Sequence, residues 1–293
     1  MKHLHERPAV VLAGVVLALV ALAGMITIAR LSTVQEDDDA ATQPLADNTP
    51  LAVATRPPAA ATTTSAADAP IADKLLAPTT VTDRLCRTPS WSDDAHGVET
   101  FALVTLGCLN AAWQPVVEGL NISFRPAKLQ LGADPLPSNC LRPDEPTSFY
   151  CSGTIYLVES SFRATNTGKS GVPAAAESML AHEFGHHLQY LAGTLQDSTS
   201  RIAAVGADSD AGRELTRRVE LQAQCFAGIF MGASTDGDTL DFARRDSYTR
   251  GDTAGGPRVH GTPQNYGDWF TQGAVRNSLD ACDTWTAAPN SVA

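Results

Sequence analysis

Helical spacing of apolar residues is the clearest pattern at the start of the region that follows residue 81. Between residues 98 and 113, apolar side chains recur every three or four positions, which places them on one face of an α-helix. Ser92 or Asp93 can cap this helix, because their side-chain oxygens accept hydrogen bonds from free backbone N–H groups. Pro115 is expected to end or kink the helix, because proline has no N–H to donate within it.

Short runs of β-type composition follow this helix. They occupy residues 121–124 (NISF), 128–131 (KLQL) and 154–158 (TIYLV), and turns rich in proline and glycine separate them. Runs of this length predict the strands of a small β-sheet.

Helical patterns return in the last part of the chain. Residues 174–191 form a strong helical pattern, in which Pro173 suits the first turn and Gly193 suits the end. A second helix is expected over residues 211–230, with Asp210 as its N-cap. The order of these elements predicts an α+β fold that is mainly helical and contains a small β-sheet.

An uncharged apolar run near the start of the chain predicts a membrane anchor. Residues 9–29 carry no charge and, at about 1.5 Å per residue, can cross a hydrocarbon layer of about 30 Å. Basic residues precede the run and the acidic segment 36–39 follows it, which favours a cytoplasmic N-terminus. A signal peptide cleaved near residues 21–23 is the alternative, and it would also export the rest of the chain.

These features divide the chain into three parts. Residues 1–30 are expected to form a cytoplasmic tip and a transmembrane helix that contacts the lipid bilayer through residues 9–29. Residues 31–80 are mostly alanine, threonine and proline without an aromatic residue, so we interpret them as a disordered stalk. The folded domain is expected over residues 81–293. The net charge is −11, and no segment is basic enough to favour nucleic acid as a partner.

All six cysteines follow the expected anchor, on the side that would be exported. An even number of cysteines in an exported domain indicates disulfides and not free thiols. The sequence alone does not fix their pairing, and Cys140 with Cys151 is the pair that we expect first.

The motif HEFGH, residues 182–186, lies within the helix expected over residues 174–191. Residues four apart face the same side of a helix, so His182 and His186 can bind one metal ion while Glu183 borders its open coordination position. Bound Zn²⁺ lowers the pKa of its water to about 7, and Glu183 would pass the proton of this zinc-bound water to the leaving amine. The alternative is a surface helix with two solvated histidines.

Two further residues of this helix refine the interpretation. Gly185 costs about 1 kcal/mol in a helix interior relative to alanine, so it indicates that another backbone packs closely against this face. His187 would project about 100° away from His186, so we expect it to support the site or to lie on the polar face, and not to bind the metal.

A third ligand is expected from another element, because catalytic zinc has three protein ligands and an open position. Glu220 is the candidate, because a carboxylate within an otherwise apolar helix is costly to bury unless it is paired or bound to a metal. The alternative is a partly exposed Glu220 paired with Arg217 or Arg218. Cys225 lies about 140° around the helix from Glu220, so we expect it in a disulfide, with Cys282 as the proposed partner.

Four segments resemble the bacterial family called putative neutral zinc metallopeptidase. HEFGHHLQ (182–189) and ELQAQCFAG (220–228) resemble its two signatures, and the other segments are FYCSGTIYLVESSF (149–162) and HGTPQNYGDWF (260–270). The first signature is shared by many metallopeptidases, whereas the second and its spacing are specific to the family. The resemblance spans most of the chain from about residue 81. It implies a zincin-like domain in which Glu220 is the third zinc ligand.

The sequence departs from this family at two positions near the expected site. Gln224 stands where the family usually has Asp, and its amide oxygen can accept a hydrogen bond from a ligating histidine without carrying a charge, so we expect weaker metal binding. Tyr266 stands where the family commonly has Arg, which leaves the role of that Arg open. His260 is our candidate for the donor that stabilises the oxyanion, and a structural histidine is the alternative.

Taken together, the residues predict a membrane-anchored, extracytoplasmic zinc peptidase that acts on a peptide or protein outside the membrane. The expected metal ligands are His182, His186 and Glu220, and the expected catalytic residues are Glu183 and His260. The main alternative is a zinc-containing envelope protein that binds a partner without turnover. A regulatory domain that acts through the stalk and the membrane helix is a third possibility.

Overall fold

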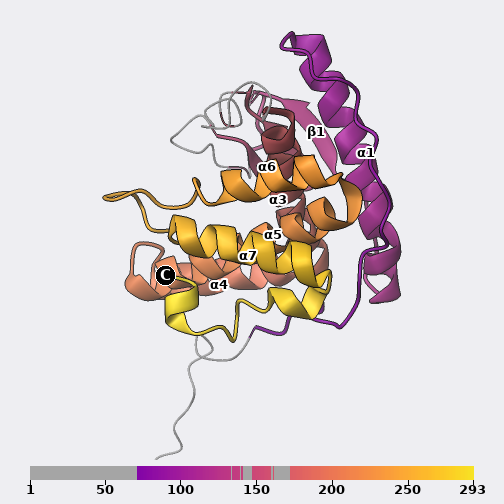
Figure 1. Ribbon diagram of the computed structural model, residues 1–293. Helices are drawn as coiled ribbons and strands as arrows, with labels where there is room; N and C mark the ends of the chain where they lie inside the picture. Colours follow the sequence, from indigo (N-terminus) through magenta and orange to yellow (C-terminus); the bar gives the residue numbers. More distant parts are fainter. Residues whose placement is uncertain (1–70, 133, 139, 141–146, 160, 162–171) are drawn as a thin grey trace, which may run out of the picture. The chain divides into compact units, whose positions relative to one another are not determined.

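The computed structural model describes residues 71–132, 134–138, 140, 147–159, 161 and 172–293. The expected membrane anchor and the first 40 residues of the expected stalk, residues 31–70, lie outside these ranges. Most of the described chain is helical (Figure 1), in six α-helices and two short 3₁₀ helices: α1 Ala95–Gly119, α3 Val172–Ala192, α4 Thr194–Val205, α5 Asp210–Ser234, α6 Gly237–Ser247, α7 Pro263–Arg276, η2 Leu279–Cys282 and η3 Pro289–Ser291.

A sheet of three short strands packs beside α1 and α3. In strand order it contains β1 (Lys128–Leu131), β3 (Thr154–Leu157) and β2 (Phe149–Cys151). β1 runs parallel to β3, whereas β2 is antiparallel to it. The structure therefore confirms the expected mixture of many helices and a small sheet.

Helix α5 is the centre of the core. It contacts each of the other described α-helices, and α3 and α7 pack most extensively against it (Figure 1). Its buried side chains include Phe226 and Phe230, and Phe226 meets Trp113 of α1 edge to face. Because α5 is buried over most of its length, any polar side chain on it needs a partner inside the protein.

Helix α1 is the one described helix that is long and apolar enough to span a membrane by length and composition. Its buried residues, among them Phe101, Leu109 and Trp113, belong to the hydrophobic core. This burial is the behaviour of a core helix in a globular domain.

Two of the three expected strands are confirmed and one is wrong. Residues 128–131 form β1, and residues 154–157 form β3. Residues 121–124 form no strand, because Asn121 adopts a φ of 57° and the Ile122 N–H closes the end of α1 by donating to the Val117 carbonyl. Strand β2 was not expected, because a three-residue strand has no readable alternation.

The expected boundaries of α1 and α5 differ from the observed ones by a few residues at both ends. Asp94 caps α1 in place of Ser92 or Asp93, and its carboxylate accepts from the Gly97 N–H. Pro115 lies inside α1, and the buried face continues beyond it to Val117.

The cap of α5 is Ser209 and not Asp210, since the Ser209 hydroxyl accepts from the Gly212 N–H. Helix α5 also extends to Ser234, four residues beyond the expected end at residue 230. Helices α4, α6 and α7 were not anticipated.

The folded domain begins before residue 81, so the expected boundary between stalk and domain is wrong. Leu75 is fully buried in the core. The Asp73 carboxylate accepts hydrogen bonds from Thr194, Gln222 and Trp285, which lie in or beside three different elements. Residues 71–80 form a short segment without helical or strand periodicity, so the sequence did not indicate that it packs against the domain.

All six cysteines are paired. The expected pairs Cys140–Cys151 and Cys225–Cys282 are present, and Cys86–Cys108 ties the segment before α1 to that helix. The Cys225–Cys282 bridge joins α5 to η2 and so fixes the C-terminal segment against the central helix.

The expected close packing at Gly185 is confirmed. A Cβ atom at this position would lie 2.7 Å from the Ala223 Cα and 2.7 Å from the Ala223 carbonyl oxygen. The absence of a side chain therefore lets α3 and α5 approach each other backbone to backbone.

Gly185→Ala should lower the free energy of unfolding by about 1–3 kcal/mol, because the added methyl group collides with the α5 backbone. The matched control is Gly107→Ala in α1, where nothing lies within 4 Å of the added atom. This control should be neutral or stabilising by up to about 1 kcal/mol. Urea unfolding measures both effects, and equal effects would contradict the close contact.

A second prediction concerns Glu177, a buried residue of α3. Burial raises the pKa of its carboxyl group from 4.5 to about 8, and one carboxyl oxygen has no hydrogen-bond partner. The folded state favours the neutral form of this carboxyl group. Its contribution to the free energy of unfolding is therefore fully present below about pH 4.5 and is lost as the pH rises towards about 8. The side chain of Glu177→Gln stays neutral at every pH. The melting temperature of this variant, relative to that of the wild type, should therefore increase between about pH 5 and pH 9. A difference in melting temperature that does not change with pH would contradict the raised pKa of Glu177.

Candidate metal centre

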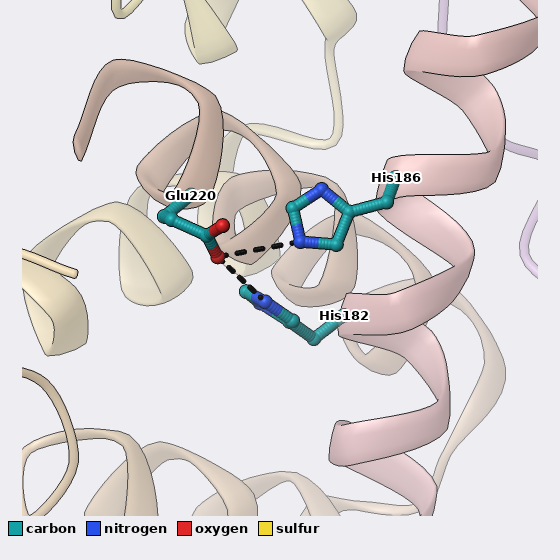
Figure 2. Close-up of side chains that lie close together, drawn as sticks. All are labelled: His182, His186 and Glu220. Carbon is teal, nitrogen blue, oxygen red and sulfur yellow. Dashed lines mark hydrogen bonds and ion pairs between the residues drawn. The ribbon is translucent and has the colours of Figure 1, made fainter. Parts of the chain in front are cut away.

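Two histidines of α3 and one glutamate of α5 converge on a single point. The Nε2 atoms of His182 and His186 lie 3.2 Å and 3.3 Å from Oε2 of Glu220 (Figure 2). The three candidate ligand atoms all lie within 4.8 Å of one another. The three residues expected as ligands therefore meet in space.

This geometry fits a tetrahedral zinc ion. With metal–ligand distances of about 2.0–2.1 Å, neighbouring ligand atoms in a tetrahedron are about 3.3 Å apart. The two distances from Glu220 Oε2 match that edge length. Two imidazoles and one carboxylate are also a common donor set for catalytic zinc, and they leave the fourth position open.

The far side of the His182 ring is held by Gln224. The Nδ1 atom of His182 lies 3.0 Å from Oε1 of Gln224, and Gln224 Nε2 donates to the Ser247 hydroxyl at 3.1 Å. Ser247 in turn donates to the Ala243 carbonyl. Since the amide nitrogen is engaged with Ser247, the amide oxygen faces His182 and accepts from Nδ1–H, which leaves the lone pair on Nε2.

His186 is oriented in the same way by Gln189. Its Nδ1 atom lies 2.9 Å from Oε1 of Gln189, whose Nε2 donates to the Val219 carbonyl and to Gln222. Both imidazoles therefore direct Nε2 towards Glu220.

Tyr266 touches the same nitrogen as Gln224. Its hydroxyl lies 3.3 Å from Nδ1 of His182, and burial raises its pKa, so it stays neutral. The two positions that depart from the family pattern thus meet at one atom. Nδ1 of His182 therefore contacts two neutral groups, the Gln224 amide and the Tyr266 hydroxyl.

Burial and mutual contact set the charges of the cluster. Burial alone would raise the pKa of Glu220, but His186 and His182 hold it well below its usual value. Burial alone would lower the pKa of His186, but Glu220 outweighs it and raises this pKa to about 9. For His182, burial dominates and lowers the pKa. The cluster therefore combines an ionised Glu220 carboxylate, a protonated His186 and a neutral His182, and a bound cation would displace the proton of His186.

Glu183 lies beside the ligands and is buried. Burial raises its pKa to about 7, while His186 lowers it and Glu220 adds to the increase. A carboxyl group with this pKa can both accept and donate a proton near neutral pH.

A pocket of about 560 Å³ opens onto these residues. Helix α3 lines it with His182, Glu183 and His186, and strand β2 lines it with Phe149 and Tyr150. It is large enough for several residues of a peptide.

His260 lies at the rim of the pocket. Its Nε2 is 3.7 Å from Oε2 of Glu220, and its side chain is 46% exposed. Asp252 fixes the preceding loop by accepting hydrogen bonds from the backbone N–H groups of Val259 and His260. Its role as an oxyanion donor stays a prediction, and so does the alternative of a structural histidine.

Residues 72–285 match the family described as Putative neutral zinc metallopeptidase. The chain belongs to this family. Uncharacterized proteins of Mycobacterium tuberculosis (strain H37Rv) and Mycobacterium bovis are each 30% identical to it over 235 residues, which are 69% of this chain and 75% of theirs. The uncharacterized protein YpfJ of Escherichia coli K12 is 27% identical over 218 residues, which are 68% and 75% of the two chains. No solved structure matches the chain.

In this zinc metallopeptidase family member, two alternatives raised by the sequence are wrong. The motif helix is not a surface helix, because His182 is only 6% exposed. Glu220 is not paired with its neighbouring arginines, since Arg217 donates to backbone carbonyls and Arg218 pairs with Glu214.

His187 has a structural position beside the metal ligands. It is 1% exposed, so it does not lie on a polar face. Its Nε2 donates to the Arg125 carbonyl at 2.7 Å, and its Nδ1 accepts from the Tyr150 hydroxyl at 3.0 Å. Burial lowers its pKa to about 4, which keeps the ring neutral. His187 thereby ties β2, and with it one wall of the pocket, to α3.

Tyr150 and Arg250 are among the pocket residues that sequence reasoning missed. Tyr150 stands in a segment that resembles the family, which could have drawn attention to it. Arg250 follows α6 in a charged stretch and carries no motif.

The adjacent histidines provide a matched test of this assignment. His186→Ala should reduce zinc content from roughly one ion per chain to near zero, because it removes a ligand. His187→Phe should retain zinc but lower the free energy of unfolding by about 2–4 kcal/mol, because the Tyr150 hydroxyl and the Arg125 carbonyl lose their partner. Metal analysis and urea unfolding distinguish the two, and zinc loss in His187→Phe alone would reverse the assignment.

Proposed function

We propose that the chain is a zinc-dependent peptidase that hydrolyses peptide bonds outside the cytoplasmic membrane. The observation that carries the proposal is the convergence of His182, His186 and Glu220 on one point at the base of a pocket, with Glu183 beside them. Membership of a zinc metallopeptidase family supports the same reaction class.

His182, His186 and Glu220 would hold the ion. Zinc bound there supplies a Lewis acid that polarises the substrate carbonyl and makes water acidic enough to act at neutral pH. Gln224 and Gln189 orient the two imidazoles, so that the donor atoms need little rearrangement.

Glu183 would carry the proton. Its carboxylate takes a proton from the attacking water and passes it to the nitrogen of the leaving amine, which completes hydrolysis of the amide bond. Its pKa of about 7 suits both halves of this transfer. His260, at the rim, would donate a hydrogen bond to the developing oxyanion, a contribution that is typically about 3–4 kcal/mol.

The proposed location is the outer side of the cytoplasmic membrane, with residues 9–29 as a single anchor and the N-terminus inside. Three disulfides support an oxidising compartment, because cytosolic proteins rarely keep such bonds. Substrates would then be peptides or proteins of the cell envelope or the surroundings.

A second candidate function is zinc-dependent binding without turnover. It is favoured by the neutral contacts of His182, since an amide at Gln224 raises the basicity of the imidazole less than a carboxylate would.

The decisive substitution is Glu183→Gln in the full-length protein. It should lower peptide hydrolysis by about 10²–10⁴-fold while zinc content stays unchanged, because it removes a proton carrier and no ligand. Cleavage of a mixed peptide library, followed by mass spectrometry, measures the loss.

Glu177→Gln is the matched control, because Glu177 is a second buried glutamate of α3 that does not line the pocket. This control should retain hydrolysis. Zinc binding without hydrolysis by the wild type would favour the binding function instead.

A further inference from the structure

One basic side chain lines the pocket beside the metal centre, and the reaction described above does not use it. Arg250 lies three residues beyond the end of α6 and is the one arginine or lysine among the described residues that line this pocket. Its guanidinium Nε donates to Oδ2 of Asp246 at 2.5 Å. Asp246 is 1% exposed, so the arginine is held by a buried anchor.

The hydrogen bonds of this guanidinium are incomplete. Its Nη2 atom is buried and has no hydrogen-bond partner among the described residues, and Oδ1 of Asp246 also has none. The ion pair is therefore joined by a single hydrogen bond. The side chain of Arg250 is nevertheless 21% exposed and lines the pocket, so its guanidinium can form further hydrogen bonds with a molecule bound there.

Two buried arginines of α5 have the contacts expected of a purely structural guanidinium. Arg217 donates to two backbone carbonyls, and Arg218 donates to three carbonyls and to Glu214. Neither has a buried nitrogen without a partner. Arg250 differs from both in this respect and in lining the pocket.

The surrounding loop keeps Arg250 next to the reactive residues. Gly251 adopts a φ of 91°, and a Cβ atom there would lie 2.7 Å from the Gly261 carbonyl, next to His260. The Asp252 N–H donates to the same carbonyl. The positive charge of Arg250 also acts on the Tyr266 hydroxyl, which contacts His182. The guanidinium is thus held close to the metal ligands.

We propose that Arg250 binds a carboxylate of the substrate, so that the site prefers peptides with a negative charge close to the bond that is cut. A guanidinium pairs with a carboxylate through two parallel hydrogen bonds, which fixes the position of a peptide as well as attracting it. The carboxylate is either the free C-terminus or an acidic side chain. The proposal rests on the proposed peptidase function, because it names the substrates of that site.

The test is peptide capture by immobilised, zinc-loaded full-length protein that carries Glu183→Gln. Two pairs of mixed-sequence peptide pools serve as probes. One pair differs only in a C-terminal carboxylate or carboxamide, and the other only in an internal glutamate or glutamine. We expect about tenfold enrichment of the carboxylate form in one pair, and the pair that shows it identifies the source of the charge.

The same capture is then repeated with Arg250→Gln combined with Asp246→Asn, which removes both charges and leaves no buried ion unpaired. Enrichment should fall to within about twofold while zinc content stays unchanged. Undiminished enrichment would overturn the proposal, because the carboxylate would then bind the metal and not the arginine. Absence of enrichment in the parent protein would also overturn it.

A second variant covers the case in which the double substitution does not fold. Arg250→Lys keeps the charge but loses the planar pair of nitrogens, so enrichment should fall at least about threefold. Zinc content and the Glu183-dependent hydrolysis are measured separately from peptide capture. Absence of hydrolysis would contradict the proposed peptidase function, whereas absence of enrichment would contradict only the carboxylate site.

Discussion

The close contact between α3 and α5 at Gly185 brings the three candidate metal ligands together. The candidate ligands His182 and His186 flank this glycine, three residues before it and one after it. Ala223 on the facing helix lies three residues after Glu220. Helices that touch backbone to backbone bring the side chains on either side of the contact within reach of one another. A larger residue at position 185 would force the helices apart and separate Glu220 from the histidines.

The polar groups around the ligands follow from the same packing. Because α5 is buried on all sides, its glutamines at 222 and 224 find partners only on the elements that surround it. Gln224 bridges His182 and Ser247, and Gln189 on α3 reaches back to α5. These hydrogen bonds fix both rings with neutral groups. The Nδ1 side of each ring is therefore held by a neutral amide, whereas the ionised Glu220 carboxylate faces the Nε2 side.

The sequence was informative where the physics is local. The spacing of two histidines on one helix, a glycine in a helix interior and a carboxylate in an apolar helix each have a local cost or geometry. The convergence of the three candidate ligands and the helix contact could therefore be predicted. Residue 260 could be placed near the site only by resemblance.

Features that depend on tertiary contacts could not be predicted. The docking of Asp73 and the burial of His187 behind Tyr150 rest on partners distant in the sequence. The ion pair of Arg250 with Asp246 is local, but its place in the pocket follows from the loop contact between Gly251 and Gly261. Strand β2 is too short to have a pattern, and the segment at residues 121–124 has β-type composition but no neighbouring strand.

The central claim is that one divalent ion binds between α3 and α5. Anomalous diffraction from a crystal of the zinc-loaded protein, recorded on both sides of the zinc absorption edge, tests it directly. The account predicts one strong peak about 2.0–2.2 Å from His182 Nε2, His186 Nε2 and a Glu220 carboxylate oxygen. A peak bound by other residues, or a Glu220 side chain turned away from the histidines in the presence of zinc, would contradict it.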